Sequence, residues 1–263
     1  MIMGILNVTP DSFSDGGRYG SLDAAITHGR QLADEGADII DVGGESTRPG
    51  AAPVGVNDEL DRVVPVIEAL AQDGIAVSID TAKPEVAAAA LAAGAVVVND
   101  VTGLADPAMI EAIVESKAGV VIMHMQGEPR TMQDDPQYGD VVAEVGDFLV
   151  GRARAAEGAG VAAERIAIDP GIGFGKNLDH NLDLLRNLHV LVETGYPVLL
   201  GASRKSFLGR ILGGKVPAAE RDPATGATVA LAIEQGVAVV RVHNVAMTVQ
   251  IARTVEAILG RSS

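Results

Sequence analysis

The chain has 263 residues, of which 48% are hydrophobic and 21% are charged, so it can bury a full core and still dissolve. Its 35 Asp and Glu residues outnumber its 20 Lys and Arg residues, and the net charge of −15 argues against nucleic acid and anionic membranes as main partners. The absence of cysteine excludes disulfides, thiolate catalysis and thiolate metal sites. The sequence displays neither a signal peptide nor a membrane-spanning run, so a cytoplasmic protein is expected.

Eight short apolar stretches, rich in β-branched residues, alternate with stretches of helical periodicity. The predicted strands cover residues 2–8, 37–43, 75–81, 95–100, 119–125, 165–171, 197–203 and 237–243. The predicted helices cover residues 21–36, 57–73, 84–93, 106–116, 139–160, 178–194, 223–236 and 244–260. This alternation predicts an α/β fold, a (β/α)8 TIM barrel with residues 1–263 in a single domain. A doubly wound sheet is the alternative, but no glycine fingerprint follows the first strand.

Almost every predicted strand ends in a polar side chain or is closely followed by one. These residues are Asn7, Asp41, Asp80, Asn99, His124, Asp169, Lys205, Arg241 and His243. The carboxyl ends of the strands form the active-site face of such a barrel. The sequence therefore predicts that these side chains converge on one mouth.

The third predicted strand, "IAVSIDT" (75–81), separates small or polar residues from large apolar ones. Its side chains alternate between two faces, so Ser78 and Asp80 are expected to face the barrel interior. With Asn99 and Asp169, Asp80 could bind a metal, sugar hydroxyls or a flat heterocycle. A metal alone is disfavoured because no histidine-rich or closely spaced carboxylate set is present. A heterocycle edge with parallel donors suits the two oxygens of a carboxylate.

A group of basic residues is predicted after the last two strands. Arg241 and His243, in "VVRVHN", share one face, and "GASRKSFLG" adds Arg204 and Lys205. Phosphate groups often bind at this position in such barrels, near a helix N-terminus.

The role of His124 stays open. The other histidines fall in or beside predicted helices and are expected at the surface or in caps: His28, His180 and His189.

Two polar loops follow the first two strands, "NVTPDSFSDGG" (7–17) and "GGESTRPG" (43–50). Long loops at a catalytic mouth commonly close over substrate and exclude water. These loops are therefore predicted to be lids.

Seven motifs together resemble those of the dihydropteroate synthase family. They are "GILNVTPDSFSDGG", "DVGGESTRPG", "VSIDT", "VNDVTG", "DPGIGFGK", "GASRKSFLG" and "RVHNV", in the family's order and covering Gly4 to about Val245. The resemblance implies a (β/α)8 barrel of folate biosynthesis. It would join 6-hydroxymethyl-7,8-dihydropterin diphosphate to 4-aminobenzoate, giving 7,8-dihydropteroate and diphosphate. Magnesium and a homodimer are also implied.

The resemblance further implies roles for individual residues. The pterin would lie against Asp80, Asn99, Met123, Asp169, Phe174 and Lys205. Diphosphate would meet Asn7, Thr47, Arg241 and His243, with magnesium at Asn7. The aminobenzoate would lie near Phe13, Thr47, Arg48, Pro49, Lys205 and Ser206. The expected catalytic set is Asp80, Lys205, Asp15, Arg241 and His243.

These assignments suggest a dissociative, SN1-like course. Diphosphate would leave once its charge is neutralised, and Asp80 and Asp15 would stabilise the cation that remains on the pterin methylene. Sulfonamides, which mimic 4-aminobenzoate, are expected to compete for its site. One alternative is a catalytically silent pterin-binding paralogue. A methyltetrahydrofolate:corrinoid methyltransferase is a weaker alternative, because it would have no use for a diphosphate site.

Overall fold

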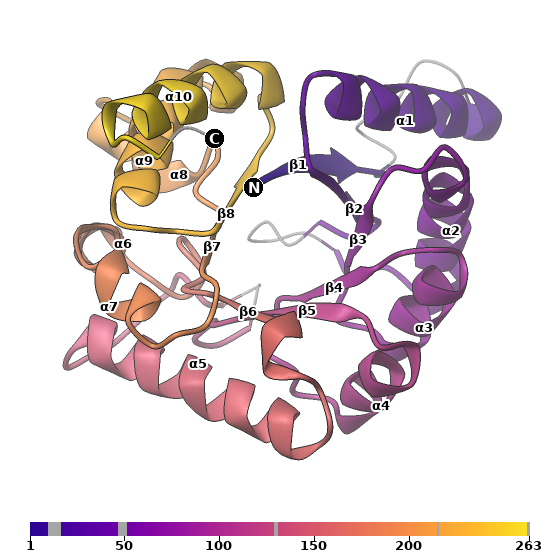
Figure 1. Ribbon diagram of the computed structural model, residues 1–263, viewed down its shortest axis with the longest axis horizontal. Helices are drawn as coiled ribbons and strands as arrows, with labels where there is room; N and C mark the ends of the chain where they lie inside the picture. The colour runs from indigo at the N-terminus through magenta and orange to yellow at the C-terminus, as the bar shows by residue number, and fades with distance from the viewer. Residues whose placement is uncertain (10–16, 47–51, 129–130, 215, 262–263) are drawn as a thin grey trace.

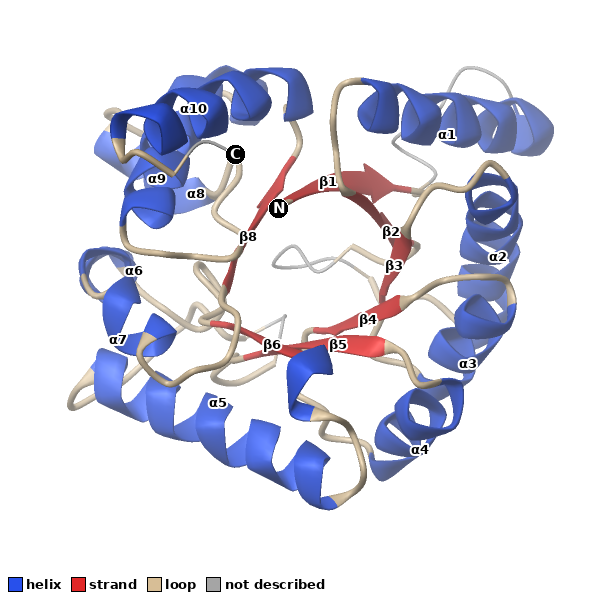
Figure 2. Cartoon of the chain, viewed as in Figure 1, coloured by secondary structure: helices blue, strands red, loops and turns tan. Residues whose placement is uncertain are grey.

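The computed structural model describes residues 1–9, 17–46, 52–128, 131–214 and 216–261. Within them, eight parallel strands form a ring surrounded by helices, as Figure 1 and Figure 2 show. The strands are β1 (Ile2–Asn7), β2 (Ile39–Gly43), β3 (Val77–Asp80), β4 (Val97–Asp100), β5 (Gly119–Met123), β6 (Ile166–Asp169), β7 (Leu199–Leu200) and β8 (Val239–Val242). The predicted (β/α)8 barrel is therefore confirmed.

The strand order around the sheet is β6-β5-β4-β3-β2-β1-β8-β7, and every ladder is parallel. β1 pairs with both β2 and β8, so the first and last strands lie side by side. The ring closes between β6 and β7 through a single bridge, Ile168 with Val198. β7 has two residues where a strand over 197–203 was predicted; Pro197, which has no N–H to donate to a ladder, limits it only at its start.

The described helices lie outside the ring (Figure 2). They are α1 (Gly17–Asp34), α2 (Val56–Gln72), α3 (Pro84–Ala92), α4 (Pro107–Ser116), α5 (Val141–Gly158), α6 (Leu178–Arg186), α7 (Leu188–Val192), α8 (Ser206–Ile211), α9 (Asp222–Glu234) and α10 (Val245–Ile258), with 3-10 turns at Ala163–Arg165 and Ala218–Arg221. The predicted helix over 178–194 is divided at Asn187, whose φ of −119° and ψ of 30° are not helical. The short helix α8 was not predicted.

Side-chain caps set several of these helix starts. The Asp140 carboxylate accepts the N–H groups of Val142 and Ala143 at the start of α5. Asn177 and His180 form a reciprocal capping box at the start of α6. The expectation that His180 is a capping residue is therefore confirmed.

The apolar core has two parts, separated by the barrel wall. The larger part lies between strands and helices and contains Val77 and Ile79, both fully buried. The smaller part joins Met3, Ile39, Val121 and Leu199, which come from β1, β2, β5 and β7. Strands on different sides of a ring can share a cluster only through its interior. Because side chains alternate along a strand, Ser78 and Asp80 belong to the interior face, as the sequence predicts.

No helix within the described ranges is both long enough and apolar enough to cross a membrane.

Candidate active site

Arg241 lies at the centre of the barrel mouth and joins two carboxylates. Its Nε donates to Asp41 Oδ2 at 2.6 Å, and one terminal nitrogen donates to Asp80 Oδ2 at 2.6 Å. Burial opposes the guanidinium charge, but the two carboxylates raise the pKa of Arg241 above its ordinary value. Arg241 is 19% exposed, so a ligand that enters the mouth can reach it. The arginine is thus held by two protein carboxylates.

Asp41 forms the floor beneath this ion pair and is fully buried. The Asn99 amide donates to its Oδ2 at 3.1 Å. Its other oxygen, Oδ1, and the hydroxyl of Ser78 have no hydrogen-bond partner among the described residues. Asp41 and Ser78 are register partners on neighbouring strands. Buried polar atoms normally have a hydrogen-bond partner, so Asp41 Oδ1 and the Ser78 hydroxyl can each bind a polar ligand group or an ordered water.

Asp80 stands at the end of β3 and is the register partner of Asn99, the next-to-last residue of β4. Burial raises the pKa of Asp80 to about 7; the charge of Arg241 opposes this shift, whereas Asp41 adds to it. A carboxyl group with a pKa near neutrality changes its charge readily, which is common for groups in a reactive site.

Asp169 and Lys205 are two further charged groups at the mouth that influence each other electrostatically. Asp169 accepts the Gly171 N–H at 2.7 Å, and burial raises the pKa of its carboxyl, against the effect of Lys205. The Lys205 ammonium donates to the Ile172 carbonyl and lies 4.4 Å from the centre of the Phe174 ring. Burial lowers the pKa of Lys205 to about 8, although Asp169 opposes that shift. These contacts unite β6, its loop and the end of β7.

His243 follows β8 and contacts Ser203, which follows β7. The Ser203 hydroxyl lies 2.9 Å from His243 Nδ1 and accepts the His243 backbone N–H at 3.2 Å. We assign the hydroxyl proton to Nδ1, since the hydroxyl then acts as both acceptor and donor. This places the ring proton of a neutral His243 on Nε2, which can donate to an anion.

Arg204 does not belong to the cationic group in which the sequence placed it. Its φ of 59° turns the side chain away, and its guanidinium binds both oxygens of Asp222 at 2.7 and 2.8 Å. Asn244 also donates to Asp222, at 2.9 Å. The Arg204 charge is therefore neutralised locally, and the pair links the segment after β7 to the start of α9. The basic residues that remain at the mouth are Lys205 and Arg241, with His243 as a further N–H donor.

The remaining predicted residues have different positions. Met123 ends β5, is 3% exposed and is the register partner of Asp169, whereas Asn7 ends β1 beside Gly43. Ser206 is exposed at the start of α8. Five predicted residues lie outside the described residues: Phe13, Asp15, Thr47, Arg48 and Pro49.

Sequence reasoning missed a partly buried ion-pair cluster at the base of the second loop. The Lys83 ammonium donates to both Glu45 and Glu59, and Glu59 is fully buried. The Val54 N–H lies 3.4 Å from Glu45 Oε1, so Glu45 joins the two ends of this loop. We call Glu45, Glu59 and Lys83 the loop neck. The charged residue Lys83, directly before α3, can be noticed in the sequence, but its partners Glu45 and Glu59 are distant along the chain.

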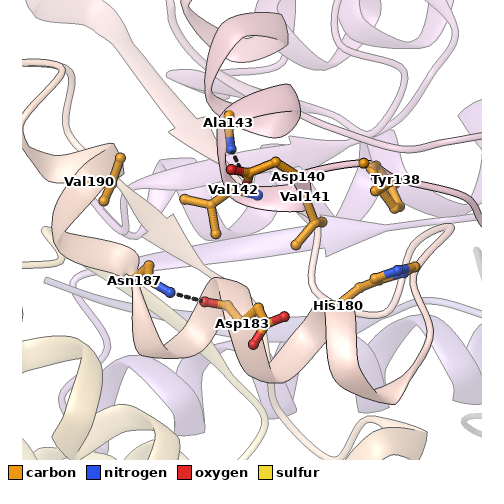
Figure 3. Close-up of a pocket in the computed structure, with 10 residues that line it drawn as sticks. Tyr138, Asp140, Val141, Val142, Ala143, His180, Asp183, Asn187 and Val190 are labelled. Carbon is orange, nitrogen blue, oxygen red and sulfur yellow. Dashed lines mark hydrogen bonds between the residues drawn. The ribbon is translucent and has the colours of Figure 1, made fainter.

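A second hollow lies outside the barrel, between the start of α5 and helices α6 and α7 (Figure 3). Its lining residues are Tyr138, Gly139, Asp140, Val141, Val142, Ala143, His180, Asp183, Asn187 and Val190. None of the predicted site residues lines it. The candidate active site is therefore the barrel mouth and not this hollow.

The described part of the chain holds no group of three or more His, Asp or Glu side chains arranged to bind a metal. The Asn7 amide oxygen at the mouth is the type of hard donor that Mg²⁺ accepts. The donor set fits a magnesium ion that takes most of its ligands from a phosphate-bearing substrate.

Comparison with known proteins gives a consistent result. The model of the pterin binding enzyme family matches residues 3–243. The dihydropteroate synthase of Escherichia coli is 49% identical over 259 residues, covering 98% of this chain and 91% of that protein. The structure of the Xanthomonas albilineans dihydropteroate synthase with 4-aminobenzoic acid has a TM-score of 0.92 and 49% identity, covering 98% and 92% of the two chains. A Yersinia pestis dihydropteroate synthase in a sulfonamide drug complex has a TM-score of 0.93 and 45% identity, covering 99% and 94%.

Proposed function

The chain belongs to the dihydropteroate synthases of the pterin-binding enzyme family, and from that premise we propose how its barrel mouth performs the reaction. The amino nitrogen of 4-aminobenzoate forms a bond to the exocyclic methylene of 6-hydroxymethyl-7,8-dihydropterin diphosphate. The carbon–oxygen bond to diphosphate breaks, and the nitrogen loses one proton. The observation that carries this proposal is the convergence of Asp80, Asn99, Asp169, Lys205 and Arg241 in one mouth.

The pterin would enter deepest, where carboxylates and an amide face the interior. Asp169 would offer carboxylate oxygens to the parallel N–H donors of the heterocycle, and Asn99 and Asp80 lie on β4 and β3, which β5 separates from β6. Met123 and Phe174 would pack on the ring faces. Lys205, held against the Phe174 ring, would donate to an acceptor of the pterin.

The diphosphate would bind toward Asn7, Arg241 and His243, together with Thr47, which lies outside the described residues. Arg241 is bound to Asp41 and Asp80, so the anion would compete with Asp80 for its outer nitrogen. His243 would donate through Nε2. Neutralising the charge on the departing group lowers the barrier to its departure.

A magnesium ion would be held by Asn7 and by oxygens of the diphosphate itself. When bound, it would supply charge neutralisation at the leaving group. Asn7 orients the diphosphate from the end of β1, and Arg241 approaches it from β8, which pairs with β1.

Departure of diphosphate leaves positive charge on the pterin methylene, which gives the reaction an SN1-like course. Release of Arg241 to the anion frees the Asp80 carboxylate, which then stabilises this cation. Asp15, from the first loop, is proposed for the same task but lies outside the described residues. The weakly nucleophilic aminobenzoate nitrogen mainly needs correct positioning.

The aminobenzoate would bind at the outer rim, near Lys205 and Ser206. Phe13, Thr47, Arg48 and Pro49 complete its proposed site but lie outside the described residues. The Yersinia pestis relative binds a sulfonamide drug, which supports the proposal that sulfonamides compete with 4-aminobenzoate here. We also propose that residues 1–263 form one domain, that the enzyme is a homodimer, and that it acts in the cytoplasm.

The test combines purified protein, dihydropterin diphosphate, 4-aminobenzoate and Mg²⁺. Mass spectrometry would follow dihydropteroate while a coupled assay follows diphosphate. We expect the two products to form in equal amounts. Pterin binding without product would instead indicate the silent paralogue and would remove the catalytic roles given to Arg241 and His243.

A further inference from the structure

The loop between β6 and α6, residues 170–177, makes three contacts in the proposed pterin site. The Gly171 N–H binds Asp169 at 2.7 Å, and the Ile172 carbonyl accepts from Lys205. Phe174 places its ring 4.4 Å from the Lys205 ammonium. The path of this loop therefore determines where a carboxylate, an ammonium and an aromatic ring meet the substrate.

This loop lies directly against the segment that follows β5. Gly171 and Gly175 have φ values of +65° and +60°, in the left-handed region. A Cβ on Gly171 would lie 1.9 Å from the His124 carbonyl oxygen, and one on Gly175 would lie 2.2 Å from the Gln126 carbonyl oxygen. Only glycine permits this approach, so the two segments pack backbone against backbone.

Lys176 joins the β6–α6 loop to the segment that follows β5. Its side chain is 2% exposed, and its Nζ lies 2.9 Å from His124 Nδ1, 2.9 Å from the Phe174 carbonyl and 3.4 Å from the His124 carbonyl. An ammonium has three N–H groups, and these three acceptors come from both segments. Burial lowers the pKa of Lys176 to about 7, against the effect of Asp169. Burial also lowers the pKa of His124 to about 3, so its ring is neutral and Nδ1 can accept.

Further contacts hold the loop from its outer side. The Tyr138 hydroxyl donates to the Gly175 carbonyl at 2.8 Å, and Asn181 Oδ1 accepts the Gly173 N–H at 2.6 Å. The His124 ring packs edge-on against Phe148 at 4.9 Å between ring centres. His124, whose role the sequence left open, therefore belongs to a packed support behind the mouth.

We propose that Lys176 and His124 form a clamp that holds the β6–α6 loop in the shape that binds the pterin, with both acting as positioning residues. The inference rests on the proposed pterin site. The clamp fixes the Gly171 N–H on Asp169 and the Ile172 carbonyl on Lys205 before substrate enters. Its acceptors are neutral, so whenever Lys176 is protonated the ammonium also adds positive charge near Asp169 and favours the ionised carboxylate that binds heterocycle N–H groups.

The first experiment replaces Lys176 with Met, which keeps the length of the side chain and removes its donors. Calorimetry would measure the dissociation constant of dihydropterin diphosphate, and steady-state kinetics would give the Michaelis constants of both substrates. We expect that dissociation constant to rise at least tenfold, while the Michaelis constant for the aminobenzoate at saturating pterin substrate changes less than twofold. Arg165→Met is the matched control. Arg165 lies just before β6, at the opposite end of the barrel, and donates to the Lys117 carbonyl at 2.7 Å. It should leave pterin binding unchanged.

A second pair of variants tests the partner. His124→Gln retains a side-chain acceptor for Lys176, whereas His124→Leu removes it. We expect pterin affinity in His124→Gln to lie between wild type and His124→Leu. Adding His124→Leu to Lys176→Met should weaken binding little further, because the clamp is already broken. Wild-type affinity in Lys176→Met, or equal losses in the two His124 variants, would overturn the proposal. If Lys176→Met does not fold, the His124 pair decides.

Asp169→Asn separates failure of the clamp from failure of the proposed pterin site. If Asp169→Asn weakens pterin binding and Lys176→Met does not, the clamp is wrong and the site stands. If Asp169→Asn binds pterin as wild type does, the site itself is wrongly placed. Product formation by the wild-type enzyme provides the reference for both results.

Discussion

The two ends of the barrel interior follow the same alternation of side chains but differ in chemistry. Toward the amino ends of the strands, Met3, Ile39, Val121 and Leu199 form a small apolar plug. The next inward-facing residues on β1, β2 and β5, two positions further along each strand, are Ile5, Asp41 and Met123. Arg241 comes from β8. A shift of one inward position on β2, from Ile39 to Asp41, thus separates apolar packing from a buried ion pair.

This difference shows how one fold provides stability and reactivity in separate layers. The plug removes water from the barrel without needing any hydrogen bond. The charged layer above it is costly to bury and leaves two oxygens without partners, Asp41 Oδ1 and Ser78 Oγ, among the residues that the structure describes. Such unsatisfied groups have a natural explanation at a binding site, where a ligand completes them. Changes in the mouth should therefore alter activity first, and changes in the plug should alter stability alone.

Arg241→Met should give the largest effect, because it removes the only guanidinium bound to both Asp41 and Asp80 among the described residues. We expect kcat/KM for dihydropterin diphosphate to fall about 10³-fold, the size of effect seen when one preorganised donor is lost. The unfolding free energy should fall by about 3 kcal/mol, since two buried carboxylates lose their partner. Steady-state kinetics and urea unfolding would measure these changes. Arg30→Met, which breaks an exposed pair with Asp73, is the control and should change neither quantity appreciably.

Asp80→Asn should change the pH dependence of activity and lower kcat about 10²-fold. Asp80 becomes charged as pH rises through about 7, and Lys205 loses its charge above about 8. The wild-type kcat/KM should therefore rise toward pH 7 and fall above pH 8, and the variant should keep only the alkaline fall. A variant that retains the acid limb would show that this limb belongs to another group, such as the diphosphate.

The same shift predicts a change in stability with pH. The native carboxyl of Asp80 binds a proton between pH 3.8 and about 7 that the unfolded chain does not bind. Its contribution to the unfolding free energy is thus fully present below pH 3.8 and is lost as pH rises through 7. Urea unfolding of Asp80→Asn across this range should lack that component.

Val121→Ala tests the apolar plug. Val121 is 3% exposed and packs in the interior, so the smaller side chain should lower the unfolding free energy by about 2 kcal/mol through lost burial and a cavity. The Michaelis constants of both substrates should remain within twofold of wild type at a temperature where the variant is folded. A clear loss of pterin affinity would mean that plug and mouth are mechanically coupled, contrary to the separation described above.

Lys83→Met should give the smallest loss of activity and should act on the other substrate. It breaks the loop neck, so the loop proposed to hold the aminobenzoate loses its attachment to Glu59. We expect the Michaelis constant for the aminobenzoate to rise about fivefold, or about 1 kcal/mol, with little change in pterin affinity. Glu45→Gln, which keeps an acceptor for Lys83 and for the Val54 N–H, should produce a weaker change of the same kind. A rise in the Michaelis constant for the pterin substrate alone would refute this assignment.

The sequence predicted the barrel well because period-two alternation and strand-end polarity are local signals. Ser78 and Asp80 were assigned to the correct face from the alternation within one short strand. Arg204 was misplaced because its left-handed backbone conformation, which directs the side chain to Asp222, has no signature in the sequence. The roles of Lys176 and Lys83 were missed because their side-chain partners lie 24 or more residues away in the sequence. Burial of a lysine against neutral acceptors becomes visible only when the backbone path is known.

The short closure between β6 and β7 has a consequence for local opening of the barrel. Between β6 and β7 the ladder consists of one bridge, Ile168 with Val198, where neighbouring strands share several pairs. Asp169 follows this seam on one side, and Lys205 lies beyond it on the other. A pterin that contacts both residues would therefore tie the two edges together. Backbone amides along the seam should exchange with deuterated solvent sooner than those of β1 and β2 in the free enzyme, and occupancy of the mouth should slow them selectively.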